Sequence, residues 1–301
     1  MAKQKVYVLV GLPHSGAALL RLGMERHREA LAAERVQLPA ESEDEMFRAA
    51  VSLRREHRAW SLSHKDVDAA WSRIWRRAWG TKDTVVLGSD LLAGMSVEEI
   101  ALMVDRFPGF AVHVVVLVGA PDPRVALFPD ELDLTRVLHR WRSAVKSPDR
   151  VHVIAIDPKD PQPAWQSLGQ VVGFGADALP LPEQPLAPGR LDPATVRLIA
   201  DAAGAHASAS DLRELSEAWA KLVADEGYDV RGELGSAAAT SGATGEDAAA
   251  YDGARVAILS EALSESVAEV VRLRERVAYL DGRRTKSEKK RRKLKKRLKA
   301  T

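Results

Sequence analysis

A short segment near the N-terminus, residues 11–18, has the residue types and spacing of a phosphate-binding loop. It follows the apolar run at residues 6–10 and leads into an apolar helix, and its second glycine, Gly16, comes five positions after the first. Backbone N–H groups in such a loop converge on an anion at the positive end of the helix dipole. Nucleotide triphosphatases place Lys and then Ser or Thr after the second glycine, whereas this chain has Ala17 and Ala18. The loop therefore predicts anion binding without ordinary ATPase or GTPase chemistry.

The elements around this loop indicate how it is positioned. Apolar strands alternate with helical segments, which predicts a three-layer, doubly wound and mostly parallel sheet of the α/β class. The second strand ends in Ser89 and Asp90. Because ligands of such sheets bind beyond the carboxyl ends of the strands, we expect both residues beside the loop. The predicted strands cover residues 6–10, 84–90, 112–118 and 151–156, and the predicted helices cover residues 17–33, 41–79, 96 onward, 132–145, 193–203 and 210–226.

The composition of the chain excludes several classes of site. Its 301 residues include no cysteine, so disulfides, thiolate metal sites and cysteine nucleophiles are excluded. The eight histidines show no metal-binding spacing, and His113 and His152 stand in apolar runs where a structural role is expected. We therefore expect no metal. No signal-peptide pattern and no bilayer-spanning apolar segment is present, which predicts a cytoplasmic protein without a transmembrane segment.

Three tryptophans are spaced to share one face of a helix. Trp71, Trp75 and Trp79 recur every four residues in the segment predicted to be helical. Such a stripe is typical of a helix that packs against a sheet. A wall of a binding site for a substrate is the alternative interpretation.

The C-terminal region divides into segments of different composition. Residues 1–234 form the predicted α/β domain, and residues 235–250, rich in Ala, Gly, Ser and Thr, a flexible linker. Residues 251–281 carry a heptad pattern in which seven of eight seam positions are apolar, and this predicts a coiled coil and a homodimer. A helix that packs back on its own domain is the alternative. The seam positions are Val256, Leu259, Leu263, Ser266, Val270, Leu273, Val277 and Leu280.

The last segment, residues 282–301, is a strongly basic tail. It contains twelve of the 44 Lys and Arg residues and one acidic residue, Glu288, while the rest of the chain has a net charge of −9. Such a tail suits an anionic partner, namely a nucleic acid, an anionic membrane surface or an acidic protein, with salt-dependent affinity. It has no aromatic residue to stack on bases, so sequence-specific readout of a nucleic acid is not expected. A solubilising tail without a partner is the alternative.

The loop resembles the Gly-x-Pro-Lys-Ser/Thr-Gly-Thr-Thr loop of the sulfotransferase family. Residues 89–92, the proline-rich stretch at 182–193 and the segment 227–234 are similar, in that order, to segments of bacterial sulfotransferase-like proteins. The resemblance implies a P-loop fold and binding of 3'-phosphoadenosine 5'-phosphosulfate. The residues that it assigns to this cofactor are Gly11, Pro13, His14, Ser15, Gly16, Ala17, Ala18 and Ser89.

The chain departs from the family pattern at the charged positions. His14 stands in place of the lysine, and the family's arginine after the third strand has no counterpart before Arg124. Two hypotheses follow. In the first, the protein transfers a sulfuryl group to a hydroxyl acceptor, with His14 polarising the bridging oxygen and Asp90 as general base. In the second, the cofactor site is degenerate and the protein is a non-catalytic dimeric scaffold whose basic tail binds its partner.

Overall fold

The computed structural model describes the α/β domain and not the C-terminal segments. It describes residues 3–13, 15–58, 60, 62–121, 125, 129–157, 159–182 and 209–234. The predicted linker, coiled coil and basic tail, the predicted helix at 193–203, and His14 and Arg124 lie outside the described residues. No helix in the described part of the chain is long and apolar enough to cross a membrane.

A six-stranded sheet forms the centre of the described domain, and all of its pairings are parallel. The strand order is β2-β3-β1-β4-β5-β6. The four strands predicted from apolar runs are confirmed, and short strands form both edges of the sheet. The strands are β1 (Lys5–Gly11), β2 (Val36–Gln37), β3 (Thr84–Ser89), β4 (Ala111–Val118), β5 (Val151–Ala155) and β6 (Asp229–Arg231).

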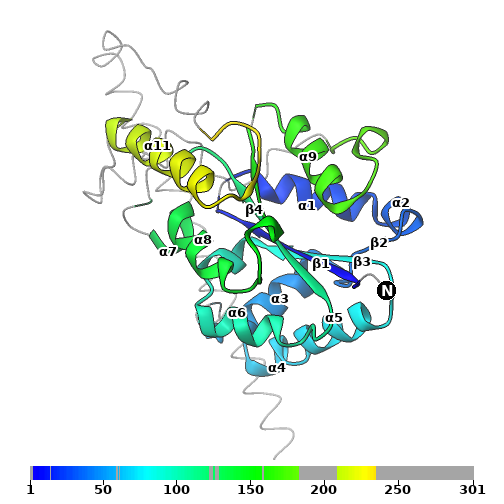
Figure 1. The fold of residues 1–301 in the computed structure, drawn as a ribbon. Helices are drawn as coiled ribbons and strands as arrows, with labels where there is room; N and C mark the ends of the chain where they lie inside the picture. The colour runs from blue at the N-terminus through cyan, green and yellow to red at the C-terminus, as the bar shows by residue number, and fades with distance from the viewer. Residues whose placement is uncertain are drawn as a thin grey trace, which may run out of the picture. The chain divides into compact units, whose positions relative to one another are not determined.

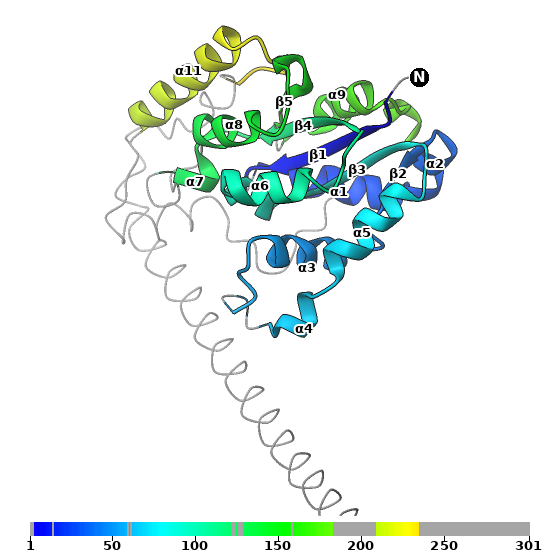
Figure 2. The same ribbon diagram turned by 60° about the horizontal axis from the view of Figure 1, so that its bottom comes forward.

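Helices cover both faces of the sheet, which confirms the three-layer, doubly wound architecture. Figures 1 and 2 show α1, α2 and α9 on one face and α3, α5 and α6 on the other. The α-helices are α1 (Ala17–Arg26), α2 (Arg28–Ala33), α3 (Glu43–Leu53), α4 (His64–Val67), α5 (Ala70–Trp79), α6 (Val97–Val104), α7 (Pro129–Leu132), α8 (Leu134–Arg142), α9 (Gln162–Val172) and α11 (Ala209–Asp225), and the 3-10 helices are η1 (Asp90–Gly94), η3 (Pro148–Arg150) and η4 (Ala176–Ala178).

Two predicted helices are shorter than expected. The segment 17–33 is divided at His27, whose φ of −101° and ψ of 20° lie outside the helical region. The segment 41–79 forms three helices rather than one. The helix expected after Ser96 is α6, and its predicted capping box is present, with the Ser96 and Glu99 side chains each accepting the other's backbone N–H.

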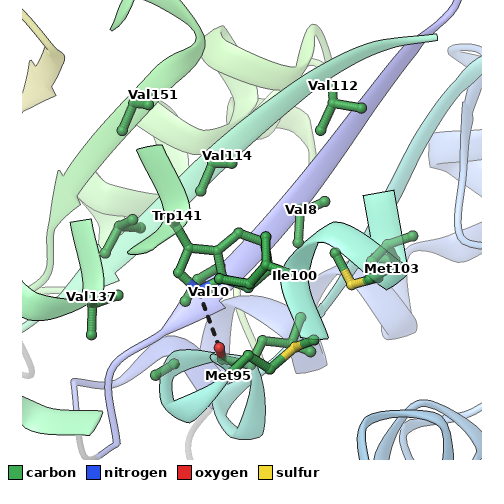
Figure 3. Close-up of a cluster of buried hydrophobic side chains, with 14 of the residues drawn as sticks. Val8, Val10, Met95, Ile100, Met103, Val112, Val114, Val137, Trp141 and Val151 are labelled. Carbon is green, nitrogen blue, oxygen red and sulfur yellow. Dashed lines mark hydrogen bonds between the residues drawn. The ribbon is translucent and has the colours of Figure 1, made fainter. Parts of the chain in front are cut away.

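Alternate residues of each strand point to opposite faces, so the sheet divides the core into two clusters. One cluster joins β1, β3, β4 and β5 to α3, α5, α6 and α8, and the other joins them to α1 and α9. Figure 3 shows Trp141 of α8 in the first cluster, packed near Val10 and Val114. Its indole N–H donates to the Leu92 carbonyl oxygen at 3.1 Å, so this fully buried tryptophan leaves no polar atom unpaired.

The tryptophan stripe is part of this packing. Trp71 and Trp79 contact Phe107 and Phe110, ring edge to ring face, in the segment that enters β4. Trp71 is buried and Trp79 is 46% exposed. Because Phe107 and Phe110 precede β4, the stripe lies toward the amino ends of the strands. Ligands of such sheets bind at the carboxyl ends, so this position favours the packing interpretation.

Candidate functional site

The predicted anion-binding loop connects β1 to α1 at the carboxyl edge of the sheet. Its turn is fixed by backbone hydrogen bonds, from Leu12 N–H to the Leu117 carbonyl oxygen (2.9 Å) and from Ser15 N–H to the Leu12 carbonyl oxygen (3.1 Å). The buried Ser15 hydroxyl accepts the Ala17 N–H at 3.3 Å. The N–H groups of Ser15 and Ala17 therefore form hydrogen bonds inside the loop and are not available to an anion.

Glycines let the ends of the neighbouring strands approach this loop closely. A Cβ on Gly11 would lie 2.2 Å from Asp90 Oδ1, and one on Gly119 would lie 3.0 Å from Ser15 Cα. Gly16, with φ +90°, adopts the left-handed backbone that begins α1, a conformation that costs other residues about 1 kcal/mol or more. The ends of β1, β3 and β4 thus converge at the loop, as the order of the strands requires.

Asp90, the predicted general base, is engaged in an ion pair with Arg21 of α1. Arg21 Nη1 lies 2.5 Å from Asp90 Oδ1 and Nη2 lies 3.2 Å from Oδ2, a two-point contact between a guanidinium and a carboxylate. Glu43, at the first position of α3, adds a second carboxylate, with Oε1 3.4 Å from Arg21 Nε. Arg21 is largely buried, at 12% side-chain exposure, so it neutralises Asp90 inside the fold.

The charges of this cluster oppose the effect of burial. Burial disfavours the charged form of Arg21, but Asp90 and Glu43 outweigh it and hold the pKa of Arg21 above its ordinary value. Partial burial raises the pKa of Glu43, against the attraction of Arg21. Glu43 thus retains its proton to a higher pH than an ordinary glutamate, and Asp90 is held in a two-point ion pair.

Ser89, the other residue predicted at the end of β3, has a structural role. The Ser89 hydroxyl accepts the Leu91 N–H at 3.3 Å and caps η1. Gly11, Pro13, Ser15, Gly16, Ala17 and Ala18 are brought together in the loop as predicted, and His14 lies outside the described residues.

A cavity of about 40 Å³ lies beside the cluster, at the part of β3 that extends beyond the two-residue strand β2. Its polar lining comes from Arg21, Glu25 and Glu43, and the rest is mostly apolar. This volume holds water molecules and is too small for a nucleotide.

A larger cavity, of about 200 Å³, lies at the carboxyl ends of β4 and β5 and is closed by the residues that follow β6. In the described part of its lining, all three charged side chains are acidic, namely Asp157, Asp160 and Glu233. We call it the acidic cavity. A phosphate or phosphosulfate group there faces three carboxylates and no cation from these residues, so the lining does not fit the anionic cofactor.

Sequence reasoning missed Arg21 and Glu43. Arg21 follows Ala17 by four positions, which places both on the helix face toward Gly11, so helical periodicity was an available signal for it. Glu43 lies far along the chain, and its approach to Arg21 depends on how α3 packs against α1, which no local pattern encodes.

Comparisons with known proteins assign no family to the chain. No family model matches it, and no curated protein is significantly similar to it. Within the described residues, no group of three or more His, Asp or Glu side chains is arranged to hold a metal ion.

Proposed function

We propose that this chain is a sulfotransferase-like P-loop protein whose cofactor site is degenerate, and that it serves as a non-catalytic dimeric scaffold. The observation that carries the proposal is the acidic cavity. An active member of such a family needs cations around its anionic cofactor, whereas the charged side chains described in the lining of this cavity, which adjoins the loop at Gly119 and Ile156, are Asp157, Asp160 and Glu233.

The ion pair at Asp90 supports the same proposal. A general base must be free to take a proton from the acceptor hydroxyl, and Asp90 is bound at both oxygens by a largely buried guanidinium. Arg21 in turn is paired with two carboxylates, so the cluster as a whole has no net positive charge to offer to a phosphate. The cluster therefore stabilises the junction of β1, β3, α1 and α3 instead of preparing a reaction.

The sequence supports the dimer and the partner. The apolar heptad seam at residues 256–280 favours self-association, and the tail at 282–301 has a net charge of +11. In this proposal the α/β domain is a folded platform, the coiled coil pairs two chains, and the two tails bind an anionic partner.

A titration of the intact chain with adenosine 3',5'-bisphosphate, followed by calorimetry, tests the loss of the cofactor site. We expect no saturable binding tighter than about 100 µM at about 0.5 M salt, because generic binding by the tail is screened there. Micromolar binding that persists at this salt concentration, and that is lost in Gly16→Val, would contradict the proposal. In Gly16→Val, a β-branched residue replaces the left-handed glycine of the loop.

Light scattering of the intact chain and of Val270→Asp tests the dimer. The charge at a central seam position is expected to convert the dimer to a monomer, while Glu269→Asp, one position away and off the seam, leaves the dimer intact. A monomeric mass for the unmodified chain, well above micromolar concentration, overturns the coiled-coil interpretation.

Sulfuryl transfer from 3'-phosphoadenosine 5'-phosphosulfate is the second candidate, and one observation favours it. The loop and Asp90 lie at the same edge of the sheet. They approach each other so closely that a Cβ added to Gly11 would lie 2.2 Å from Asp90 Oδ1. An assay with a panel of hydroxyl acceptors tests it. Turnover that is lost in both Asp90→Asn and His14→Ala supports catalysis, and turnover unchanged in His14→Ala removes that residue from the mechanism.

A further inference from the structure

An exposed tryptophan, Trp60, stands in a basic turn that joins α3 to α4. The exposed side chains of Arg55, Arg58 and Lys65 flank it in the sequence, and we call these four residues the Trp60 surface. Figure 2 shows α3 and α4 at the bottom of the α/β domain. The turn follows the far end of α3, about 15 Å along the helix from Glu43, so the surface is separate from the Arg21 cluster.

Backbone hydrogen bonds and a ring contact bring the parts of this surface together. The Trp60 N–H donates to the Glu56 carbonyl oxygen at 3.3 Å, and the Leu62 N–H donates to the His57 carbonyl oxygen at 2.8 Å. The His57 ring contacts the ring of His64, the first residue of α4, with centroids 5.7 Å apart. The start of α4 therefore lies against the turn, and its lysine joins the same surface.

The Trp60 ring is anchored and still open to solvent. It packs edge to face on Phe47 of α3, with centroids 5.0 Å apart, and is 46% exposed. Trp79 is equally exposed, but its indole N–H donates to the Arg106 carbonyl oxygen at 2.9 Å. Among the residues that the structure describes, the Trp60 indole N–H has no such partner. An anchored and exposed ring of this kind can stack on a planar ligand.

Arg55 occupies a position where glycine is the usual residue. α3 ends in a Schellman motif, in which the Glu56 N–H donates to the Val51 carbonyl oxygen at 3.1 Å. Arg55 has φ +56°, a left-handed conformation that is unfavourable for residues with a Cβ. Arg35 has the same conformation, and its side chain is paired with Asp83. Arg55 makes no ion pair within the described part of the chain, so an unpaired cation stands at a strained position.

The carboxylates of the turn leave its exposed cations unneutralised. None of the three cations of the Trp60 surface forms an ion pair with a residue that the structure describes. Glu56 is instead paired with Arg54 at 2.8 Å, and Asp66 accepts hydrogen bonds from the N–H and O–H groups of Ser63. Anionic groups of a partner therefore meet guanidinium and ammonium groups that are available to them.

We propose that the Trp60 surface binds single-stranded nucleic acid, with the indole stacked on a base and the three cations on neighbouring phosphates. An exposed aromatic ring among unpaired cations matches a chain that alternates bases with phosphates. An acidic peptide accounts for the cations and not for the indole. A membrane surface needs further apolar side chains, whereas the other exposed residues described in the turn and at the start of α4 are polar or charged.

This inference goes beyond the proposed function because it gives the α/β domain itself a role in selecting the partner. The basic tail has no aromatic residue and attracts any anionic polymer. In a duplex the bases are stacked on each other, so the indole cannot reach a base face. The Trp60 surface should therefore favour single strands, whether or not the chain is a dimer and whether or not the cofactor site is lost.

Fluorescence anisotropy of the intact chain tests this preference, with a labelled oligothymidylate of about 12 nucleotides and a hairpin duplex of equal length, at about 0.3 M salt to weaken binding by the tail. Trp60→Ala should weaken binding of the single strand about tenfold and that of the duplex less than about twofold. Trp60→Phe, which keeps a ring for stacking, should stay within about threefold of the unmodified chain. Trp79→Ala, at an equally exposed tryptophan, should leave both affinities unchanged.

Arg55→Gly tests the strained position. Each phosphate contact to a single strand contributes about 0.7 to the slope of log K against log salt, so the slope should become shallower by about 0.7. The midpoint of urea unfolding should rise, because glycine adopts the left-handed backbone without strain. Arg35→Gly removes the same strain and should leave the salt slope unchanged. An unchanged slope in Arg55→Gly would remove this cation from the surface.

Three outcomes overturn the proposal. Unchanged single-strand affinity in Trp60→Ala removes the stacking contact, and equal losses for the single strand and the duplex reduce the surface to generic charge. Loss of binding to phosphatidylserine vesicles in Trp60→Ala, without loss of single-strand binding, assigns the surface to a membrane. If Trp60→Ala does not fold, the NMR signal of the Trp60 indole N–H, assigned by its absence in Trp60→Phe, replaces it. A signal that oligothymidylate does not shift then contradicts the proposal.

Discussion

The two edges of the same parallel sheet carry polar clusters of opposite character. At the carboxyl edge, Arg21 is permanently charged and is paired with Asp90 and Glu43. At the amino edge, burial lowers the pKa of His113 to about 4, and its ring shares one hydrogen bond with His152. The first cluster joins α1, α3 and the end of β3 through ion pairs, and the charge of the second cluster depends on pH. Asp90, which was predicted to be catalytic, is therefore held in a fixed ion pair. His113, which was predicted to have a structural role, is the residue whose charge changes in the acid range.

The largest expected effect on stability comes from breaking the buried ion pair of Arg21 with Asp90, compared with the exposed ion pair of Arg35 with Asp83. Arg21→Ala leaves Asp90 and Glu43 side by side without their cation, and we expect a loss of about 3 kcal/mol in the free energy of unfolding, measured by urea denaturation. Arg35→Ala breaks an ion pair with Asp83 whose arginine is 75% exposed, and should cost less than about 0.5 kcal/mol.

Equal losses in the two arginine variants would mean that the Asp90 contact is no more than a surface ion pair. The double variant Arg21→Met with Asp90→Leu sharpens the test. Removing the pair as a whole leaves only Glu43, whose side chain is 49% exposed, without its cation, so the double variant should recover part of the stability that Arg21→Ala loses.

The amino edge gives a smaller and pH-dependent effect. Because the His113 pKa is lowered to about 4, its contribution to stability is complete above pH 6.5 and is lost as the pH falls toward 4. We expect the unmodified chain to lose about 2 kcal/mol more than His113→Phe between about pH 7.5 and about pH 5, measured by urea denaturation at each pH. Parallel pH profiles for the two chains would contradict this.

The contrast between the edges also marks what the sequence can predict. The four long strands and the loop were predictable because apolar runs and glycine spacing are local signals. The short edge strand β6 was not, since its three residues, in the stretch between Gly227 and Gly232, carry no periodicity. The sequence indicated a structural role for His113 and His152, but their contact depends on a register in which β4 and β5 begin at different levels.

The site was predictable in position and not in chemistry. Parallel topology places the ends of β1 and β3 together, so Asp90 was expected beside the loop, and the structure confirms this placement. Its partner Arg21 was missed because the predicted role left Asp90 free. The three carboxylates of the acidic cavity come from residues 157, 160 and 233, and only the pairing of β5 with β6 brings them together.

The smallest predicted effect concerns Ser89, to which the family resemblance assigns the cofactor and the structure a cap. The Ser89 hydroxyl accepts the Leu91 N–H, so Ser89→Ala should cost about 1 kcal/mol in the free energy of unfolding. Ser96→Ala, which removes the cap of α6, is the matched control and should cost a similar amount. If Ser89 is only a cap, the two variants show the same weak, salt-sensitive response to adenosine 3',5'-bisphosphate. A selective loss of ligand response in Ser89→Ala, with unchanged stability, would instead support the role in cofactor binding that the family resemblance assigns to Ser89.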